Sequence, residues 1–237
     1  MESIPSLVLA AVAALFPLAQ STPPAEGPPA PAPKIPGVAP EAEADKEGEK
    51  PSETVGEITV NRPPLPLWRF ESKSAGFGER ILLAKPFPEG AAEPPSSAFE
   101  DTWGIEALSL LGRYEAAVLV TTLDRGAHTN IGSQMVDPGS KAQLVDAHLA
   151  LIQKHVKKTG KPKKNSNASL GGVAAAQLRV TVTSDGGRSF DVTGYFVPMK
   201  AYTYTVWFLL PADAPKPLEK EVDEIRKAVK FGKASGS

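Results

Sequence analysis

The fold is encoded most clearly in residues 177–210, QLRVTVTSDGGRSFDVTGYFVPMKAYTYTVWFLL. Apolar and polar residues alternate along 177–183 and again along 188–197, which is typical of strands with one buried face. Between them, the SDGG of residues 184–187 has the residue types of a tight turn. The pattern predicts a β-hairpin.

A third strand and a helix follow this hairpin. The PMK of residues 198–200 supplies a second turn, and residues 201–210 alternate again, so three consecutive antiparallel strands are expected. One face of the third strand carries Thr203, Thr205 and Trp207. After a proline-rich break, apolar residues recur at offsets of four, three and four, which predicts an amphipathic helix lying across the sheet. They are Leu218, Val222, Ile225 and Val229.

A longer helix is predicted upstream, over about residues 141–158. Either Ser140 or Asp137 can cap its first turn, and lysines crowd its last turn, where positive charge suits the helix dipole. The LGG of residues 170–172 then turns the chain into the three strands. The apolar side of this helix consists of Leu144, Val145, Leu149, Leu151, Ile152 and Val156.

The first half of the domain has a weaker pattern. Residues 67–71, 80–85 and 114–123 are predicted as strands, and the near-continuous apolar run of the last suits a buried central position. Residues 105–110 are also expected to form a strand, although the surrounding residues fit neither the helical nor the strand period cleanly. Residues 126–139 are expected to be a polar loop. Together these elements predict an α+β fold in which helices pack on an antiparallel β-sheet.

This order of elements resembles the C-terminal half of the PsbP-like family, named after an extrinsic subunit of the oxygen-evolving complex of photosystem II. The LGG at 170–172 and the aromatic-rich strand at 202–210 carry the resemblance, which covers about residues 114–232, while the proline-rich PPLPLW at 63–68 departs from the family pattern. The resemblance implies an α/β/α sandwich. It also implies an accessory, assembly or binding role, because the family's members, including secreted lipoproteins and a Ran-binding import factor, are mostly not enzymes.

The amino terminus is typical of an exported protein. An apolar run at residues 7–16 is followed by the small residues AQS, so residues 1–21 are predicted to be a signal peptide and the protein to be secreted or periplasmic. No Lys or Arg precedes the run, and an uncleaved membrane tether or a buried apolar segment is the alternative.

The rest of the chain divides by composition. Residues 22–57 are rich in Pro, Ala and Glu and are expected to form a disordered linker, because they offer no sustained apolar face. Residues 58–232 form the expected domain, and 233–237 a tail. The formal net charge is only −1, but the acidic residues of the linker leave the domain basic.

No residue pattern identifies a reaction. The chain has no cysteine, no G-x-S-x-G nucleophile elbow and no complete P-loop or dinucleotide fingerprint. The histidines are His128, His148 and His155; the last two lie two turns apart on the predicted helix and are expected at the margin of its apolar stripe, not on one metal ion. No cofactor, metal site or catalytic residue is predicted, and Asp191 is expected to line either a groove or plain solvent.

The best-marked polar feature is a cluster of lysines. No acidic residue interrupts it in sequence, and it could bind phosphate groups, an anionic lipid surface or an acidic partner. A solvated helix end and an intramolecular contact with the acidic linker are the alternatives. Because no aromatic residues lie nearby, specific nucleic-acid recognition is not expected. The cluster consists of Lys154, Lys157, Lys158, Lys161, Lys163 and Lys164.

The sequence therefore predicts a non-catalytic, exported accessory or scaffolding protein that binds another macromolecule or assembly at the cell envelope. If the face of Thr203, Thr205 and Trp207 is uncovered, it is the leading protein-contact surface. An enzyme is the first alternative, favoured only if a deep pocket gathers Asp191, a histidine and a lysine. A polyanion or membrane-surface binder that uses the lysine cluster is the second.

Overall fold

The computed structural model describes residues 52–55, 58–61, 65, 67–75, 78–90, 96–99 and 105–232. The predicted signal peptide, residues 22–51 of the predicted linker and the tail at 233–237 lie outside the described residues. Within this part of the chain, no helix is both long and apolar enough to cross a membrane.

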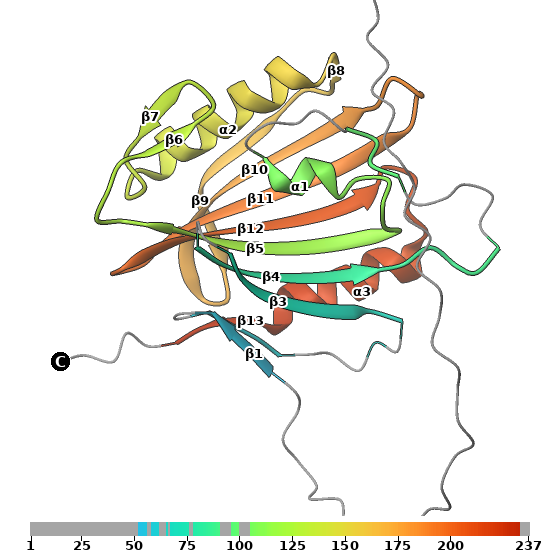
Figure 1. Cartoon of the computed structure of the whole chain (residues 1–237), viewed down its shortest axis with the longest axis horizontal. Coiled ribbons are helices and arrows are strands. Elements are labelled where there is room, and N and C mark those ends of the chain that lie inside the picture. The colour runs from blue at the N-terminus through green and yellow to red at the C-terminus, as the bar shows by residue number, and fades with distance from the viewer. Residues whose placement is uncertain are drawn as a thin grey trace, which may run out of the picture. The chain divides into compact units, whose positions relative to one another are not determined.

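An antiparallel sheet forms the centre of the domain (Figure 1). Its strands are, in spatial order, β3 (Arg69–Ala75), β4 (Gly78–Lys85), β5 (Ala116–Asp124), β12 (Tyr202–Pro211), β11 (Ser189–Pro198) and β10 (Val173–Thr183), followed by β8 (Lys158–Thr159) and β9 (Lys163–Leu170). Both β8 and β9 pair with β10. The predicted fold class, α+β with helices on an antiparallel sheet, is therefore confirmed.

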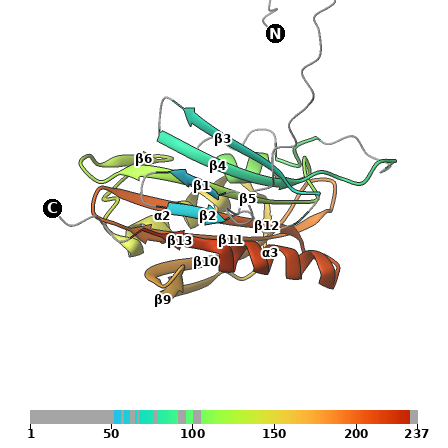
Figure 2. The ribbon, with the colours of Figure 1, turned by 90° about the horizontal axis from the view of Figure 1, so that it is seen from below.

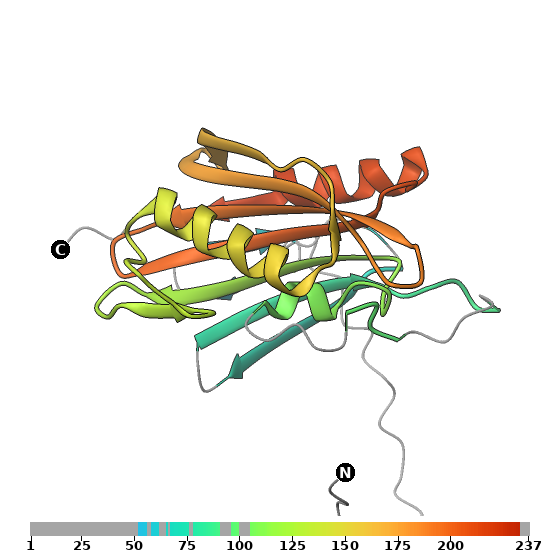
Figure 3. The ribbon, with the colours of Figure 1, turned by 90° about the horizontal axis from the view of Figure 1, so that it is seen from above.

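The two faces of the sheet are covered differently. Helix α2 (Lys141–His155) and the short α1 (Glu106–Ser109) pack on one face (Figure 3). The other face carries α3 (Lys216–Ala228) and a small sheet of β1 (Ser52–Val55), β2 (Ile58–Asn61) and β13 (Val229–Phe231), as Figure 2 shows. Because side chains alternate along a strand, Trp207 of β12 lies in the core under α2, and Phe208 lies in the core under α3.

The predictions for the second half of the chain are confirmed. Strands β10, β11 and β12 pair as consecutive antiparallel neighbours, with Val180 opposite Val192. The predicted strands at 67–71, 80–85 and 114–123 correspond to β3, β4 and β5, and β5 lies centrally between β4 and β12. Ser140 caps α2, since its hydroxyl accepts from the backbone N–H of Gln143 at 3.4 Å.

Several boundaries and elements differ from the sequence prediction. Residues 105–110 contain helix α1, not a strand, and its Ala107 and Leu108 are buried. The expected loop at 126–139 holds a hairpin of β6 (Thr129–Ile131) and β7 (Gln134–Val136). Helix α2 ends at His155, because the chain continues into β8 with Lys158.

Further strands were also not expected, among them β1, β2, β9 and β13. Strand β9 was missed because its sequence, KKNSNASL, is almost entirely exposed and shows no apolar alternation. It joins β10 through Gly171 and Gly172, whose φ angles of 58° and 83° favour glycine. Strand β1 falls inside the predicted linker, so strand pairing begins before residue 58. Val229, the last residue of the predicted helical stripe, begins β13 instead.

Candidate functional site

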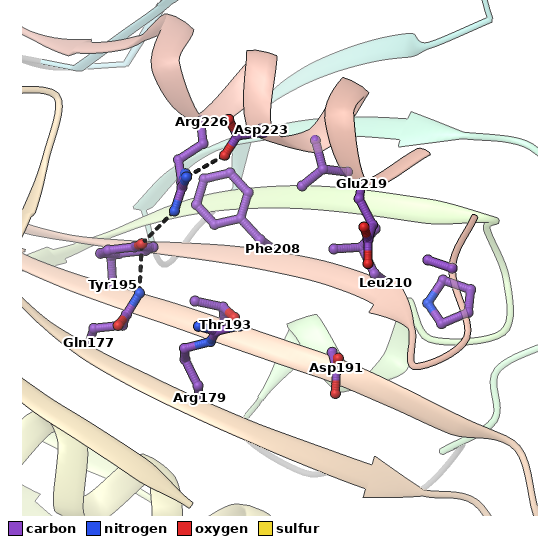
Figure 4. Close-up of a pocket in the computed structure, with 13 residues that line it drawn as sticks. Gln177, Arg179, Asp191, Thr193, Tyr195, Phe208, Leu210, Glu219, Asp223 and Arg226 are labelled. Atoms are coloured by element: carbon purple, nitrogen blue, oxygen red, sulfur yellow. Dashed lines mark hydrogen bonds and ion pairs between the residues drawn. The ribbon is translucent and has the colours of Figure 1, made fainter. Parts of the chain in front are cut away.

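A groove opens between α3 and the exposed part of β10 and β11, with a cavity volume of about 350 Å³ (Figure 4). We call it the α3 groove. Its floor consists of Gln177, Arg179, Asp191, Thr193 and Tyr195. Its wall on α3 consists of Glu219, Val222, Asp223 and Arg226, and Phe208, Leu210, Pro211 and Ala214 complete the lining.

The strand register explains why these floor residues share one face. Gln177 lies opposite Tyr195, and Arg179 lies opposite Thr193, so all four side chains point to the same side of the sheet. The apolar residues of α3 pack into the core with residues of β5 and β12. The helix therefore leaves this part of β10 and β11 beside it uncovered, and a polar floor is exposed next to an apolar edge.

Tyr195 and Arg226 connect the floor to the helix. The Tyr195 side chain is buried, with 3% of the residue exposed, and its ring packs edge-on against Phe208 at 5.8 Å between centroids. Gln177 Nε2 donates to the Tyr195 hydroxyl at 2.6 Å, and Arg226 Nη1 donates to the same oxygen at 3.5 Å. Arg226 also forms an ion pair with Asp223.

The charges on the helix wall stabilise one another. Burial alone would lower the pKa of Arg226, but the hydrogen bond to Tyr195 and the charge of Asp223 outweigh it, so this pKa is raised. The hydrogen bond from Lys227, together with the charge of Arg226, lowers the pKa of Asp223. Lys227 Nζ lies 2.8 Å from the second carboxylate oxygen of Asp223. Asp223 and Arg226 are therefore both charged at neutral pH.

A second contact holds the remote side of α3. Lys85 Nζ and Trp68 Nε1 donate to the same oxygen of Glu221, at 2.8 and 2.9 Å. Burial would raise the pKa of Glu221, but these two hydrogen bonds lower it below its ordinary value. The helix that forms the groove wall is thus tied to β4 through its other side.

The groove adjoins a smaller hollow of about 150 Å³, which shares Arg179, Asp191 and Thr193 with it and adds Lys161 and Lys163. We call this the lysine end of the groove. Asp191 accepts a hydrogen bond from Thr181 at 2.6 Å. Of the two environments considered for Asp191 from the sequence, the structure shows the groove.

The lysine cluster is divided by the fold. Acidic residues distant in sequence reach two of its members: Lys157 lies 3.0 Å from Asp185, and Lys164 lies 2.6 Å from Asp146. The cluster that no acidic residue interrupts in sequence therefore has acidic neighbours in three dimensions. Lys161 and Lys163 line the groove, whereas Lys154, on the last turn of α2, and Lys158, on β8, are exposed and do not line either hollow.

The second predicted contact surface is not available. Thr203 is fully buried, and Thr205 and Trp207 are 2% and 3% exposed, because β6, β7 and α2 cover this face. The Thr203 hydroxyl donates to the carbonyl oxygen of Pro138 at 2.5 Å. The condition that this face be uncovered is not met, so these residues belong to the core.

The histidines do not meet in the groove. His148 lies on the buried face of α2, and its Nδ1 is 2.8 Å from the carbonyl oxygen of Leu144. Its expected position at the margin of the apolar stripe is therefore wrong. No histidine lines the α3 groove, and the described residues include no group of three or more His, Asp or Glu that could hold a metal ion. The combination that would have favoured an enzyme, Asp191 with a histidine and a lysine, is not assembled.

Sequence reasoning missed most of the groove. Gln177, Tyr195 and Arg226 were not singled out, although the strand alternation placed Gln177 and Tyr195 on adjacent strands. The missing information was the position of α3, because a residue on an alternating strand is exposed or buried according to what covers it.

Comparison of the sequence with protein-family models and with curated proteins gives no match. A structure from Bacteroides thetaiotaomicron is 10% identical in sequence, with a TM-score of 0.40. The match covers 76% of this chain and 47% of the Bacteroides chain, so this chain spans about half of that protein's length. The Ran-binding protein Mog1p of Saccharomyces cerevisiae is 12% identical, with a TM-score of 0.36. This match covers 75% of this chain and 85% of the Mog1p chain.

LpqN of Mycobacterium tuberculosis, described as involved in cell envelope biogenesis, is 14% identical with a TM-score of 0.34 and covers 74% of this chain and 84% of its own. At such identities and TM-scores, these three structures supply no argument about this chain.

Proposed function

We propose that this chain is a non-catalytic accessory protein that binds another protein through the α3 groove. The observation that carries the proposal is Arg179, which lines both the groove and its lysine end. Its guanidinium forms no hydrogen bond or ion pair within the described part of the chain. A free guanidinium beside apolar side chains is suited to a protein contact, because arginine and aromatic residues are enriched in interface cores.

The composition of the groove supports a protein partner over a reactive substrate. Leu210, Pro211 and Ala214 are partly exposed and offer apolar contact next to the polar floor. The ionised groups on the wall, Asp223 and Arg226, are paired with each other, so neither is set up as a general acid or base. The groove thus provides an apolar strip with polar groups beside it, the general anatomy of a protein interface.

The proposal places the partner at the cell envelope, and this part rests on the amino-terminal sequence. The apolar run at residues 7–16 and the AQS at 19–21 predict cleavage, with the mature chain beginning near Thr22. The intact mass of protein isolated from its native cells tests this. A chain that retains Met1 would contradict cleavage.

Polyanion or membrane-surface binding by the lysine cluster is the weaker proposal. Two of the six lysines form ion pairs with Asp146 and Asp185, which reduces the positive charge of the cluster. The remaining exposed lysines are divided between the groove and the end of α2.

Replacing Arg179 by glutamate is expected to weaken partner capture. Each full-length variant is immobilised and exposed to the native envelope fraction, and every retained protein is quantified. A partner retained by the wild type is expected to fall at least about tenfold with Arg179→Glu, since a reversed charge would oppose the contact that the guanidinium makes. Arg113→Glu is the matched control, because Arg113 is exposed and does not line the groove. Equal retention profiles for the two variants would contradict the proposal.

A further inference from the structure

The Tyr195 hydroxyl has an unused donor. Its oxygen accepts from Gln177 Nε2 and Arg226 Nη1, and no described residue accepts its proton. A phenol carries one donor as well as its acceptor lone pairs, and a buried donor without a partner costs about 1–3 kcal/mol. Tyr195 is buried, and its hydroxyl faces the groove between Gln177 and Arg226 in Figure 4. A ligand atom that accepts a hydrogen bond here would remove this cost.

Arg179 and Arg226 bring positive charge to the same place. Arg179 is the diagonal neighbour of Tyr195 on the shared face of β10 and β11, a relation that separates residues by about 7–8 Å and lies within reach of a long side chain. Arg226 approaches from α3 and is held toward Tyr195 by Asp223. Three donor groups, one hydroxyl and two guanidiniums, therefore surround one part of the groove.

The acidic residues that line the groove bear on which type of anion it can bind. Asp191, Glu219 and Asp223 also line it and would repel a ligand with two negative charges more strongly than a ligand with one. A carboxylate carries one charge and has two oxygens, which suit bidentate contact with a guanidinium. The chemistry therefore favours a carboxylate over a phosphate.

The apolar lining indicates what lies next to that carboxylate. Phe208 packs on the Tyr195 ring in the core, and the partly exposed Leu210 and Ala214 line the groove. A segment that places an apolar side chain next to an acidic one would bury the first here while the second reaches the donors. An extended protein segment provides both kinds of side chain at short spacing.

We infer that the α3 groove binds an acidic side chain of an extended partner segment, with the carboxylate on Tyr195, Arg179 and Arg226 and a neighbouring apolar side chain against Leu210. This inference rests on the proposed function, because it names the chemistry of the partner that the groove would bind.

The test uses two synthetic peptides, acetyl-Leu-Glu-Leu-amide and acetyl-Leu-Gln-Leu-amide, titrated into the isotopically labelled full-length protein and followed by NMR. The Glu peptide is expected to shift the amides of β10 and β11 and to bind at least about tenfold more tightly than the Gln peptide. Tyr195→Phe is expected to weaken binding of the Glu peptide about tenfold. Tyr202→Phe, which changes an exposed tyrosine outside the groove, should leave it unchanged.

Equal affinities for the Glu and Gln peptides, or equal affinities of the Tyr195→Phe and Tyr202→Phe variants, would overturn the inference. Tighter binding of octanoate or inorganic phosphate than of the Glu peptide would overturn the assignment to a protein segment. If Arg179→Glu abolishes partner capture while the peptides behave alike, the proposed function stands and this inference fails. If Arg179→Glu also leaves capture unchanged, the proposed function fails as well.

Discussion

Replacing Gly194 by alanine is expected to lower the free energy of unfolding by about 1–3 kcal/mol, the cost of overfilling a packed core. Gly194 of β11 lies directly opposite Trp207 of β12. A Cβ at Gly194 would lie 2.5 Å from Trp207 Cζ3, so the indole ring would have to move. The ring cannot shift without disturbing its neighbours, because it packs against Phe196 at 5.6 Å and His148 at 5.4 Å between centroids.

A loss of stability on replacing Gly194 by alanine would be opposite to the usual effect of this substitution. Glycine to alanine normally stabilises a compatible backbone by about 0.4–1 kcal/mol through the unfolded state, so an unchanged or increased stability would contradict the packing described above. Gly186→Ala is the control, because a Cβ there meets only Ser184 Oγ, at 3.8 Å. Urea unfolding monitored by tryptophan fluorescence and far-UV circular dichroism measures both variants.

A double-mutant cycle separates the clash from other effects. Trp207→Leu removes the ring that a Cβ at Gly194 would meet, so Gly194→Ala is expected to cost at least about 1 kcal/mol less in that background. Additive effects of the two substitutions would show that Trp207 is not the source of the cost.

The buried His148 is expected to make the fold sensitive to mild acid. Burial lowers its pKa to about 4 from its ordinary 6.5, and the hydrogen bond to the Leu144 carbonyl only partly offsets this. Between these two values the unfolded chain binds a proton that the folded chain does not, so stability is lost as pH falls through this window. The free energy of unfolding should fall by about 2 kcal/mol between about pH 7 and pH 5.

The surroundings of His148 explain why the ring stays neutral. Phe196 of β11 and Trp207 of β12 face it, with ring centroids at 4.8 and 5.4 Å, and no described charged group is paired with it. Its Nδ1–H donates to the Leu144 carbonyl in the neutral form. A positive charge in this position would be buried among aromatic and aliphatic side chains without an anion to compensate it.

Urea unfolding at several pH values tests this prediction. His148→Leu is expected to reduce the fall in stability between about pH 7 and pH 5 to a small remainder, whatever its effect on stability at pH 7, and His128→Gln, which changes an exposed histidine, should retain the fall. The carboxylates Glu221 and Asp223, whose pKa values are lowered, lose their contribution only below their ordinary values of 4.5 and 3.8. A His148→Leu variant with the full wild-type slope would contradict the account.

Strand alternation predicted the second half of the fold because each strand there is half-buried. The hairpin of β10 and β11 and the following β12 have the expected residue period and turn chemistry. Where burial does not alternate along the chain, the pattern of apolar residues does not reveal the secondary structure. Strand β9 is an exposed edge, and α1 is too short for its four residues to show a helical period, so both escaped prediction.

The accessible face of the sheet could not be predicted from the sequence, because it depends on which helices and hairpins cover each strand. Thr203 and Thr205 alternate on β12 as expected for a half-exposed strand, but their side is buried below α2 and the β6–β7 hairpin. Arg179 and Thr193 alternate in the same way and remain accessible, because α3 packs beside them. Of the residues considered from the sequence, Asp191 lines this groove, and Lys161 and Lys163 line its lysine end.

The location of the binding surface can be measured by site-specific photocrosslinking in the native cells. A benzophenone amino acid is introduced in the full-length protein either at Thr193, in the groove, or at Gln153, exposed on α2 across the sheet. Discrete protein adducts from position 193, absent from position 153, are the result that this structure predicts. Adducts from position 153 alone, or the same adducts from both positions, would contradict the assignment of partner binding to the α3 groove.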